Sequence, residues 1–237
     1  MWLSAANNKN ASTVQENFQT AIQEIGYVPH RIRCDKGKEN SDVIFAMWRL
    51  RGLYIRTPVL TGRSVHNTRI ERLWGDVHRL IGERFKDIFG EMEDQGYLSV
   101  DSALDLWCLH QVYIPHICQA LREFRAMWDM HPSSSMAAKT PMREWLEGLS
   151  RMPEEGESIP DVDAFYAIDL DETPIQLRDD EDVSPNPVLG NWEPDLSPEI
   201  RRELLAQNCL DFYPSDEEAK DAYIRLQQHL CIIVGEV

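Results

Sequence analysis

The chain has 237 residues, 43% of them hydrophobic, and a formal net charge of -16 at pH 7. This length suits one large domain, or a domain of about 150 residues with an appended region. No apolar run reaches the roughly 18 to 20 residues of a membrane span, and the N-terminus lacks the pattern of a secretory signal. Its five cysteines are scattered, which favours reduced thiols in an intracellular protein. The sequence does not distinguish nucleus from cytoplasm.

The charge is distributed unevenly. Residues 1–150 carry 18 basic and 18 acidic side chains, whereas residues 151–237 carry 6 and 22. Within the first part, residues 31–86 hold 13 basic side chains against 6 acidic ones. Such a basic segment attracts phosphate backbones, although a merely solvated basic surface is the alternative. The acidic run at 179–182 fits a solvated loop, or a segment that folds over the basic surface and competes with nucleic acid.

The first forty residues predict a helix between two strands. Residues 1–3 are expected to end a strand, and a polar loop follows them. Apolar residues at three- and four-residue spacing predict a helix over 12–26. In the stretch 31–35, Ile32 and Cys34 alternate with arginines, which predicts a short strand. This order indicates a parallel or mixed sheet in an α/β layer fold.

The next elements are a helix, a strand and a long helix. A helix is expected over 41–51, followed by a strand over 53–57 that Pro58 terminates. Residues 61–64 form a polar loop with a glycine. Apolar side chains then recur at three- and four-residue intervals over 65–89, which predicts an amphipathic helix.

Residues 99–130 are again largely helical, and Pro115 is expected to kink or divide this helix. A short helix is predicted over 140–149, with a proline in its first turn. Two cysteines and two histidines of the longer helix point in different directions around its axis. This favours core cysteines and histidines at packing surfaces over a zinc site. The four are Cys108, His110, His116 and Cys118.

The composition changes at residue 151, where proline, aspartate and glutamate become frequent. We therefore expect two domains, 1–150 and 151–237. Residues 151–194 are expected to be a mostly extended acidic segment. Two helices are predicted after it, one over 198–208 and one that begins at Ser215 with a capping box.

Two carboxylates stand out within the first domain. Asp35 lies at the predicted end of a strand, and Gly37 is expected to let the backbone turn sharply behind it. Glu71 lies in the first two turns of the long helix, with Asn67 and Gly75 on the same face. Thirty-five residues separate the two acids. Helix, strand and loop between them are able to bring the helix start beside the strand edge.

Two carboxylates from separate elements are the minimum scaffold for a divalent cation such as Mg²⁺. With a third carboxylate, two ions are held about 3.5 to 4 Å apart and clamp the attacking and leaving oxygens of a phosphodiester. Basic side chains nearby would hold a nucleic-acid backbone. His66, Asn67 and His78 are placed to position substrate or water.

Two stretches carry a resemblance to a known family. Residues 33–40 read RCDKGKEN and residues 66–74 read HNTRIERLW. Together they resemble the integrase core of retroelement integrases and DDE transposases, most closely a eukaryotic group of integrase-core-domain proteins. This resemblance implies a ribonuclease-H-like fold, an Asp-Asp-Glu triad, and Mg²⁺ or Mn²⁺ as cofactor. It makes Asp35 the second acid and Glu71 the third. The Thr140–Pro141 segment is similar to the one that closes such cores.

The sequence departs from the family pattern at the first acid. That aspartate is expected on a strand upstream of residues 1–3, and no acidic residue occurs before Glu16. The expected fold is therefore a ribonuclease-H-like core with an N-terminally truncated mixed sheet and flanking helices, plus a helical, acidic C-terminal region. A truncated gene product and a degenerate, domesticated copy both remain open. A metal is expected to bind less tightly to two carboxylates than to three.

The predicted function is nucleic-acid binding by an integrase-derived core, with DNA favoured over RNA and with incomplete catalysis. The alternative is an inactive domesticated module that binds nucleic acid or another protein. The resemblance also implies homo-oligomers, since cores of this type usually act as multimers. Asp35 and Glu71 are the predicted catalytic and metal-binding residues. The predicted nucleic-acid-binding residues are Lys36, Lys38, Arg63, His66, Asn67, Arg69 and Arg72.

Overall fold

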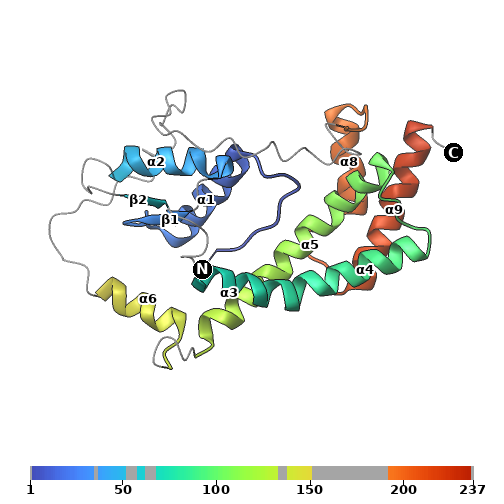
Figure 1. The fold of residues 1–237 in the computed structure, drawn as a ribbon. Helices are drawn as coiled ribbons and strands as arrows, with labels where there is room; N and C mark the ends of the chain where they lie inside the picture. Colours follow the sequence, from blue (N-terminus) through green and yellow to red (C-terminus); the bar gives the residue numbers. More distant parts are fainter. Residues whose placement is uncertain are drawn as a thin grey trace.

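A computed structural model of the protein describes residues 2–34, 37–51, 58–61, 68–132, 138–150 and 192–235; of Thr68 and Arg69 it describes the backbone. These residues form a small α/β layer near the N-terminus and a larger helical part (Figure 1). The predicted strand over 53–57 lies outside the described residues, as does most of the acidic segment. Of the predicted loop over 61–64, residues 62–64 also lie outside them, whereas Thr61 belongs to a strand.

The α/β layer contains helices α1 (Ala11–Ile25) and α2 (Ser41–Arg51), strands β1 (Ile32–Cys34) and β2 (Val59–Thr61), and the short 3₁₀-helix η1 (Lys38–Asn40). The two strands pair in parallel, with Ile32 opposite Val59 and Cys34 opposite Thr61. This parallel pairing agrees with the predicted parallel or mixed sheet, but the paired strands flank α2, whereas the prediction placed them on either side of the helix over 12–26. Seven buried side chains form its core, namely Ile22, Val28, Ile44, Ala46, Met47, Leu50 and Val59.

Two backbone features fix the connections within this layer. Helix α1 ends where Gly26 adopts a left-handed conformation, with φ of 66°, and donates its N–H to the Ile22 carbonyl. The buried Arg51 of α2 donates from Nη2 to the Val28 carbonyl at 2.7 Å. The guanidinium thereby attaches the end of α2 to the segment that precedes β1.

The helical part is built around α5 (Ala103–Met130). A rod formed by α3 (Thr68–Val77), the π-helical turn η3 (His78–Gly82) and α4 (Glu83–Asp94) contacts α5 through η3. Helices α8 (Pro198–Asn208) and α9 (Asp216–Val234) complete this part, and α9 packs on α5 (Figure 1). The predicted helix over 65–89 is confirmed from residue 68 onward and extends to Asp94.

Helix α5 runs through Pro115 without being divided, although proline removes one helical hydrogen bond. Packing against α9 and η3 on its flanks supports it. The Ser102 hydroxyl caps its start by accepting from the Asp105 N–H at 3.2 Å. Helix α6 (Pro141–Ser150) begins at the proline that the sequence placed in the first turn of a short helix. Helix α6 contacts α5.

The two predicted C-terminal helices are confirmed, and they share a core with α3, α4 and α5. Tyr223, Leu226 and Leu230 of α9 are completely buried there. Polar contacts reinforce this packing, because Tyr223 donates to the Tyr97 carbonyl at 3.0 Å and Gln227 donates to Asp105 at 2.6 Å. The division into domains at residue 151 remains a prediction.

Two local predictions are wrong. Residues 2 and 3 are not part of a strand, because this segment lies against α5, where the Ala5 N–H contacts Cys118 Sγ at 3.3 Å. Pro58 precedes a strand instead of only ending one, since β2 begins at Val59 and the Pro58 carbonyl accepts from Ile32 at 3.0 Å. Proline is tolerated there because its missing N–H is not required at the first position of a strand.

Candidate metal and nucleic-acid site

The first predicted ligand follows β1 directly. The strand ends at Cys34, and Asp35 and Lys36 come next in the chain, outside the described residues. The chain is described again at Gly37 and enters η1 at the exposed Lys38. Asp35 therefore follows the last residue of a parallel strand in the chain, and α/β proteins commonly bind ligands beyond the carboxyl ends of such strands.

Gly37 has a different role from the predicted one. Its φ of -67° and ψ of 145° are extended values that any residue adopts, so no glycine is required for a turn. A Cβ at this position would instead collide with the carboxylate of Glu39, which folds back over the glycine. The side chain of Glu39 is flexible and is able to move, so the close approach is a modest constraint.

Glu71 lies in the first turn of α3 and is exposed to solvent. A carboxylate is favoured at this position because the partial positive charge of a helix N-terminus stabilises it. Leu73 and Val77 bury the opposite side of α3 in the helical core. Arg72 is exposed next to Glu71, and a Cβ on Gly75 would meet none of the described residues within 4 Å. Glu71 is thus accessible to a ligand.

The remaining predicted site residues are described only in part. Arg63, His66 and Asn67 lie outside the described residues, and Arg69 is described by its backbone on α3 alone. No group of three or more potential metal-ligating side chains occurs among the residues whose positions are described. The proximity of Asp35 to Glu71 therefore remains a prediction.

The π-helical turn η3 was not predicted from the sequence. It joins α3 to α4 two turns after Glu71, and it carries the exposed His78. A Cβ on Gly82 would lie 3.0 Å from His78 Nδ1, so the glycine leaves room for the imidazole ring. Turns of this type occur frequently at functional sites. A glycine four residues after the histidine is the only sequence signal for this arrangement.

The cysteine and histidine positions on α5 agree with the structural role predicted for them. Cys108 is completely buried, and burial raises the pKa of its thiol. Burial likewise lowers the pKa of His110. His116 is 3% exposed and lies among the rings of Phe85, Tyr113 and Tyr213. These residues stabilise the helical part.

Sequence reasoning missed one ionic cluster in the helical part. Asp216, the first residue of α9, accepts from Arg84 Nε at 3.0 Å and from Arg84 Nη2 at 2.6 Å. The Nε2 atom of His116 also lies 2.8 Å from Asp216 Oδ1. Partial burial raises the pKa of Asp216, but the hydrogen bonds from Arg84 and His116 outweigh it, and the net pKa lies below its ordinary value. This cluster joins α4, α5 and α9.

Comparison with known proteins identifies the family. Residues 1–158 match the family model described as "Integrase core domain", which is more than half of the chain. The chain belongs to the integrase core domain family, and the resemblance carried by residues 33–40 and 66–74 is confirmed. No curated protein and no solved structure matches the chain. Among the described helices, none has the length and apolarity needed to cross a bilayer.

Proposed function

We propose that residues 1–150 form an integrase-derived core that binds nucleic acid, with DNA preferred to RNA. The observation that carries this proposal is the family match over residues 1–158. Glu71 and Arg72 are both exposed in the first turns of α3, which supports the proposal. Arg72 is available to a phosphate backbone, and Glu71 is available to the cations that accompany it. Residues 151–237 would be an acidic extension whose helices pack on the core.

Asp35 and Glu71 are the proposed ligands of Mg²⁺ or Mn²⁺. The fit rests on the donor chemistry, since both are carboxylates and hard divalent cations prefer oxygen ligands. Glu71 is exposed on its helix, and Asp35 directly follows the end of β1. When bound, such an ion polarises a phosphoryl oxygen and neutralises charge on the phosphodiester.

The family resemblance assigns two of the three triad acids to these 237 residues, namely Asp35 and Glu71. We therefore propose that they bind nucleic acid but do not transfer phosphoryl groups on their own. Lys36, Lys38 and Arg63 would contact the phosphate backbone from one side, and Arg69 and Arg72 from α3. His66 and Asn67, which precede α3, would position the strand near the two carboxylates.

The test compares two arginines on the same helical rod by fluorescence anisotropy with labelled duplex DNA over a salt series. Arg72 is exposed beside Glu71, whereas Arg79 is paired with Asp76 at 2.9 Å. Arg72→Gln should weaken binding and reduce the salt slope by about 1, because one phosphate contact is lost. Arg79→Gln is the matched control and should change the slope less. Duplex RNA as competitor would distinguish the two nucleic acids.

The same samples test the metal ligands through Mn²⁺ binding followed by electron paramagnetic resonance. Glu71→Gln should reduce the bound Mn²⁺, since a carboxylate ligand becomes a neutral amide. Glu83→Gln removes another exposed carboxylate, from the first turn of α4, and is the control. Equal Mn²⁺ binding by both variants would contradict the metal assignment. Wild-type protein with no salt-dependent affinity for DNA or RNA would overturn the proposed function.

A further inference from the structure

Trp74 of α3 is the most exposed tryptophan of the chain. It is 51% exposed, whereas Trp145 is 44% and Trp48 is 37% exposed, and the other four are less exposed than these. Trp145 also meets the ring of Tyr27 edge to face, while Trp74 makes no ring contact among the described residues. Tryptophan is large and is on average highly buried in folded proteins, so this exposure requires an explanation.

Other exposed side chains share the side of the rod that carries Trp74 (Figure 1). Ile70 precedes Trp74 by one turn and is 42% exposed, and the exposed His78 follows it by one turn on η3. Glu71 precedes Trp74 by three residues, a spacing that also places two side chains on one side of a helix. Next to Trp74, a Cβ on Gly75 would meet none of the described residues within 4 Å. The Trp74 platform, defined as Ile70, Trp74 and His78, thus lies beside the proposed metal ligand.

Positive charge lies on the other side of Glu71. Around the axis of an α-helix, Trp74 lies about 60° from Glu71, and Arg72 lies about 100° from Glu71 in the opposite direction. Arg72 is exposed, and the sequence segment 31–86 that includes it holds 13 basic side chains against 6 acidic ones. A polynucleotide strand that crosses α3 would therefore place a phosphate on the arginine side and a base on the aromatic side.

We propose that the Trp74 platform stacks an unpaired nucleobase, so that the core prefers a nucleic acid with a single-stranded tail to one that is fully paired. Within a duplex, each base is stacked on its neighbours and presents only its edge to a protein. The face of an exposed indole ring therefore recognises a base that has left the stack. Such stacking tolerates all four bases, so the preference is for an unpaired strand and not for a sequence. This inference rests on the proposed nucleic-acid binding and adds the state of the strand to it.

Charge and size both favour a nucleobase over a protein segment as the occupant of the platform. The cores of protein interfaces are depleted of charged residues, whereas Glu71 and Arg72 are both exposed within one turn of Trp74. The platform consists of three side chains, while a standard protein interface uses roughly 20 to 30 residues from each partner. A single base needs only one ring face for stacking and a nearby cation for its phosphate.

Fluorescence anisotropy with two labelled DNA probes tests the proposal on the full chain. Both probes share one duplex and a tail of about six nucleotides. One tail carries thymines and the other is abasic, so the phosphate charge is equal and only the bases differ. The wild-type protein should bind the thymine-tailed probe at least about fivefold more tightly than the abasic-tailed probe.

Three variants locate the preference. Trp74→Leu should reduce the affinity ratio of the two probes to about 1, because leucine keeps an apolar side chain but has no ring face. Trp74→Phe should retain part of the preference, since a smaller aromatic ring remains. Trp145→Ala removes the exposed tryptophan of α6 and should leave the ratio unchanged. Circular dichroism of each variant verifies that it is folded.

The same probes distinguish failure of this inference from failure of the proposed function. Arg72→Gln should weaken the binding of both probes by a similar factor, because it removes a phosphate contact that they share. Wild-type protein that binds both probes with equal, salt-dependent affinity would overturn the stacking role and leave the proposed function in place. An unchanged ratio in Trp74→Leu would also overturn it, since another residue would then contact the bases. Wild-type protein with no salt-dependent affinity for either probe would overturn both.

Discussion

The helical part and the α/β layer have hydrophobic cores of different size. Among the described residues, 23 buried side chains form the core of the helical part and seven form the core of the α/β layer. The two strands of the layer are three residues long, and a sheet of this size is marginal without packing from helices. The predicted metal ligand Asp35 follows the smaller core, whereas Glu71 projects from the larger one.

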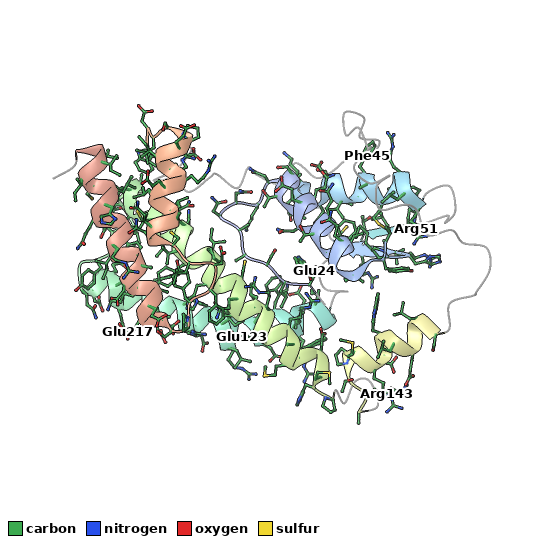
Figure 2. The ribbon with its side chains drawn as sticks, turned by 180° about the vertical axis from the view of Figure 1, so that it is seen from behind. Glu24, Phe45, Arg51, Glu123, Arg143 and Glu217 are labelled. Carbon is green, nitrogen blue, oxygen red and sulfur yellow. The ribbon has the colours of Figure 1, made fainter. Side chains whose placement is uncertain are left out.

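This difference means that the two halves of the candidate site depend on separate cores. Among the described residues, the contacts that join the parts include the N-terminal segment, where Ala5 lies against Cys118, and an ion pair. Arg125 of α5 lies 3.1 Å from Glu24 of α1, and its guanidinium also lies over the Trp2 ring at 5.5 Å (Figure 2 labels Glu24). Exposed ion pairs of this kind contribute up to about 1 kcal/mol each. The relative position of the two acids is therefore expected to respond to changes in either core.

The largest expected effect comes from the contact between α9 and α5. Leu226→Ala should lower the free energy of unfolding by about 3 kcal/mol, because it leaves a cavity where the side chain is completely buried. Urea denaturation followed by circular dichroism measures this loss. Ile232→Ala on the same helix changes a side chain that is 68% exposed and should cost about 0.5 kcal/mol or less.

A second buried site sharpens the comparison of the two cores. Met47→Ala empties a position in α2 that is also completely buried. Hydrogen exchange should then show faster exchange in α1 and α2 for Met47→Ala, and in α5 and α9 for Leu226→Ala. Loss of protection across both parts in each variant would show that they unfold as one unit and would contradict the comparison.

The next effect concerns the Asp216 cluster and depends on pH. The folded pKa of Asp216 lies below its unfolded value of about 3.9, so its stabilising contribution is present above that value. This contribution is lost as pH falls through the folded pKa. Asp216→Asn should therefore lower the free energy of unfolding by about 1 kcal/mol at pH 6, a value reduced for the partial exposure of the Arg84 pair.

The measurement is the stability difference between wild type and Asp216→Asn from pH 6 down to pH 2.5. The difference should shrink at the acidic end, because protonation removes the charge that the substitution removes. Asp211→Asn, an exposed aspartate of the same α8–α9 connection, controls for the general loss of a negative charge. A stability difference that stays constant down to pH 2.5 would contradict the role assigned to this carboxylate.

The elements that the sequence predicted correctly have long hydrophobic periodicity or a clear cap. The helix over 68–89 and the capped start of α9 at Ser215 are examples, since neither depends on distant residues. The Asp216 cluster could not be predicted because it joins residues 100 to 132 positions apart. Residues 2–3 were misassigned for a similar reason: their apolar character fits a strand, but contacts with α5 decide their conformation.

In the candidate site, too, some features were predicted from the local sequence and others were not. Local spacing predicted Asp35 and Glu71 as ligands, and residue composition predicted that residues 31–86 form a basic segment; both remain predictions. The π-helical turn η3 was missed because it preserves the helical pattern of apolar residues and differs only in its hydrogen bonding. The role of Gly37 was misassigned because a glycine after an acid resembles a turn. Only the backbone angles and the position of Glu39 distinguish a turn from a close side-chain approach.

The smallest expected effect compares two glycines of the α/β layer. Gly26→Ala should cost about 1 kcal/mol, because φ of 66° is unfavourable for a residue with a Cβ. Gly37→Ala should change the free energy of unfolding by less than about 0.5 kcal/mol, since its φ is -67° and the colliding Glu39 carboxylate is free to rotate away. Thermal denaturation of both variants measures the difference.

The Gly37→Ala variant also separates stability from function at the strand end. If Glu39 must remain folded over Gly37 to keep the Asp35 segment in position, Mn²⁺ binding should fall in Gly37→Ala while its melting temperature stays near that of wild type. The double variant Gly37→Ala, Glu39→Ala should then also bind less Mn²⁺ than wild type, while its melting temperature stays near that of wild type. A large drop in melting temperature for Gly37→Ala alone would show that the glycine is required by the backbone, contrary to its extended φ.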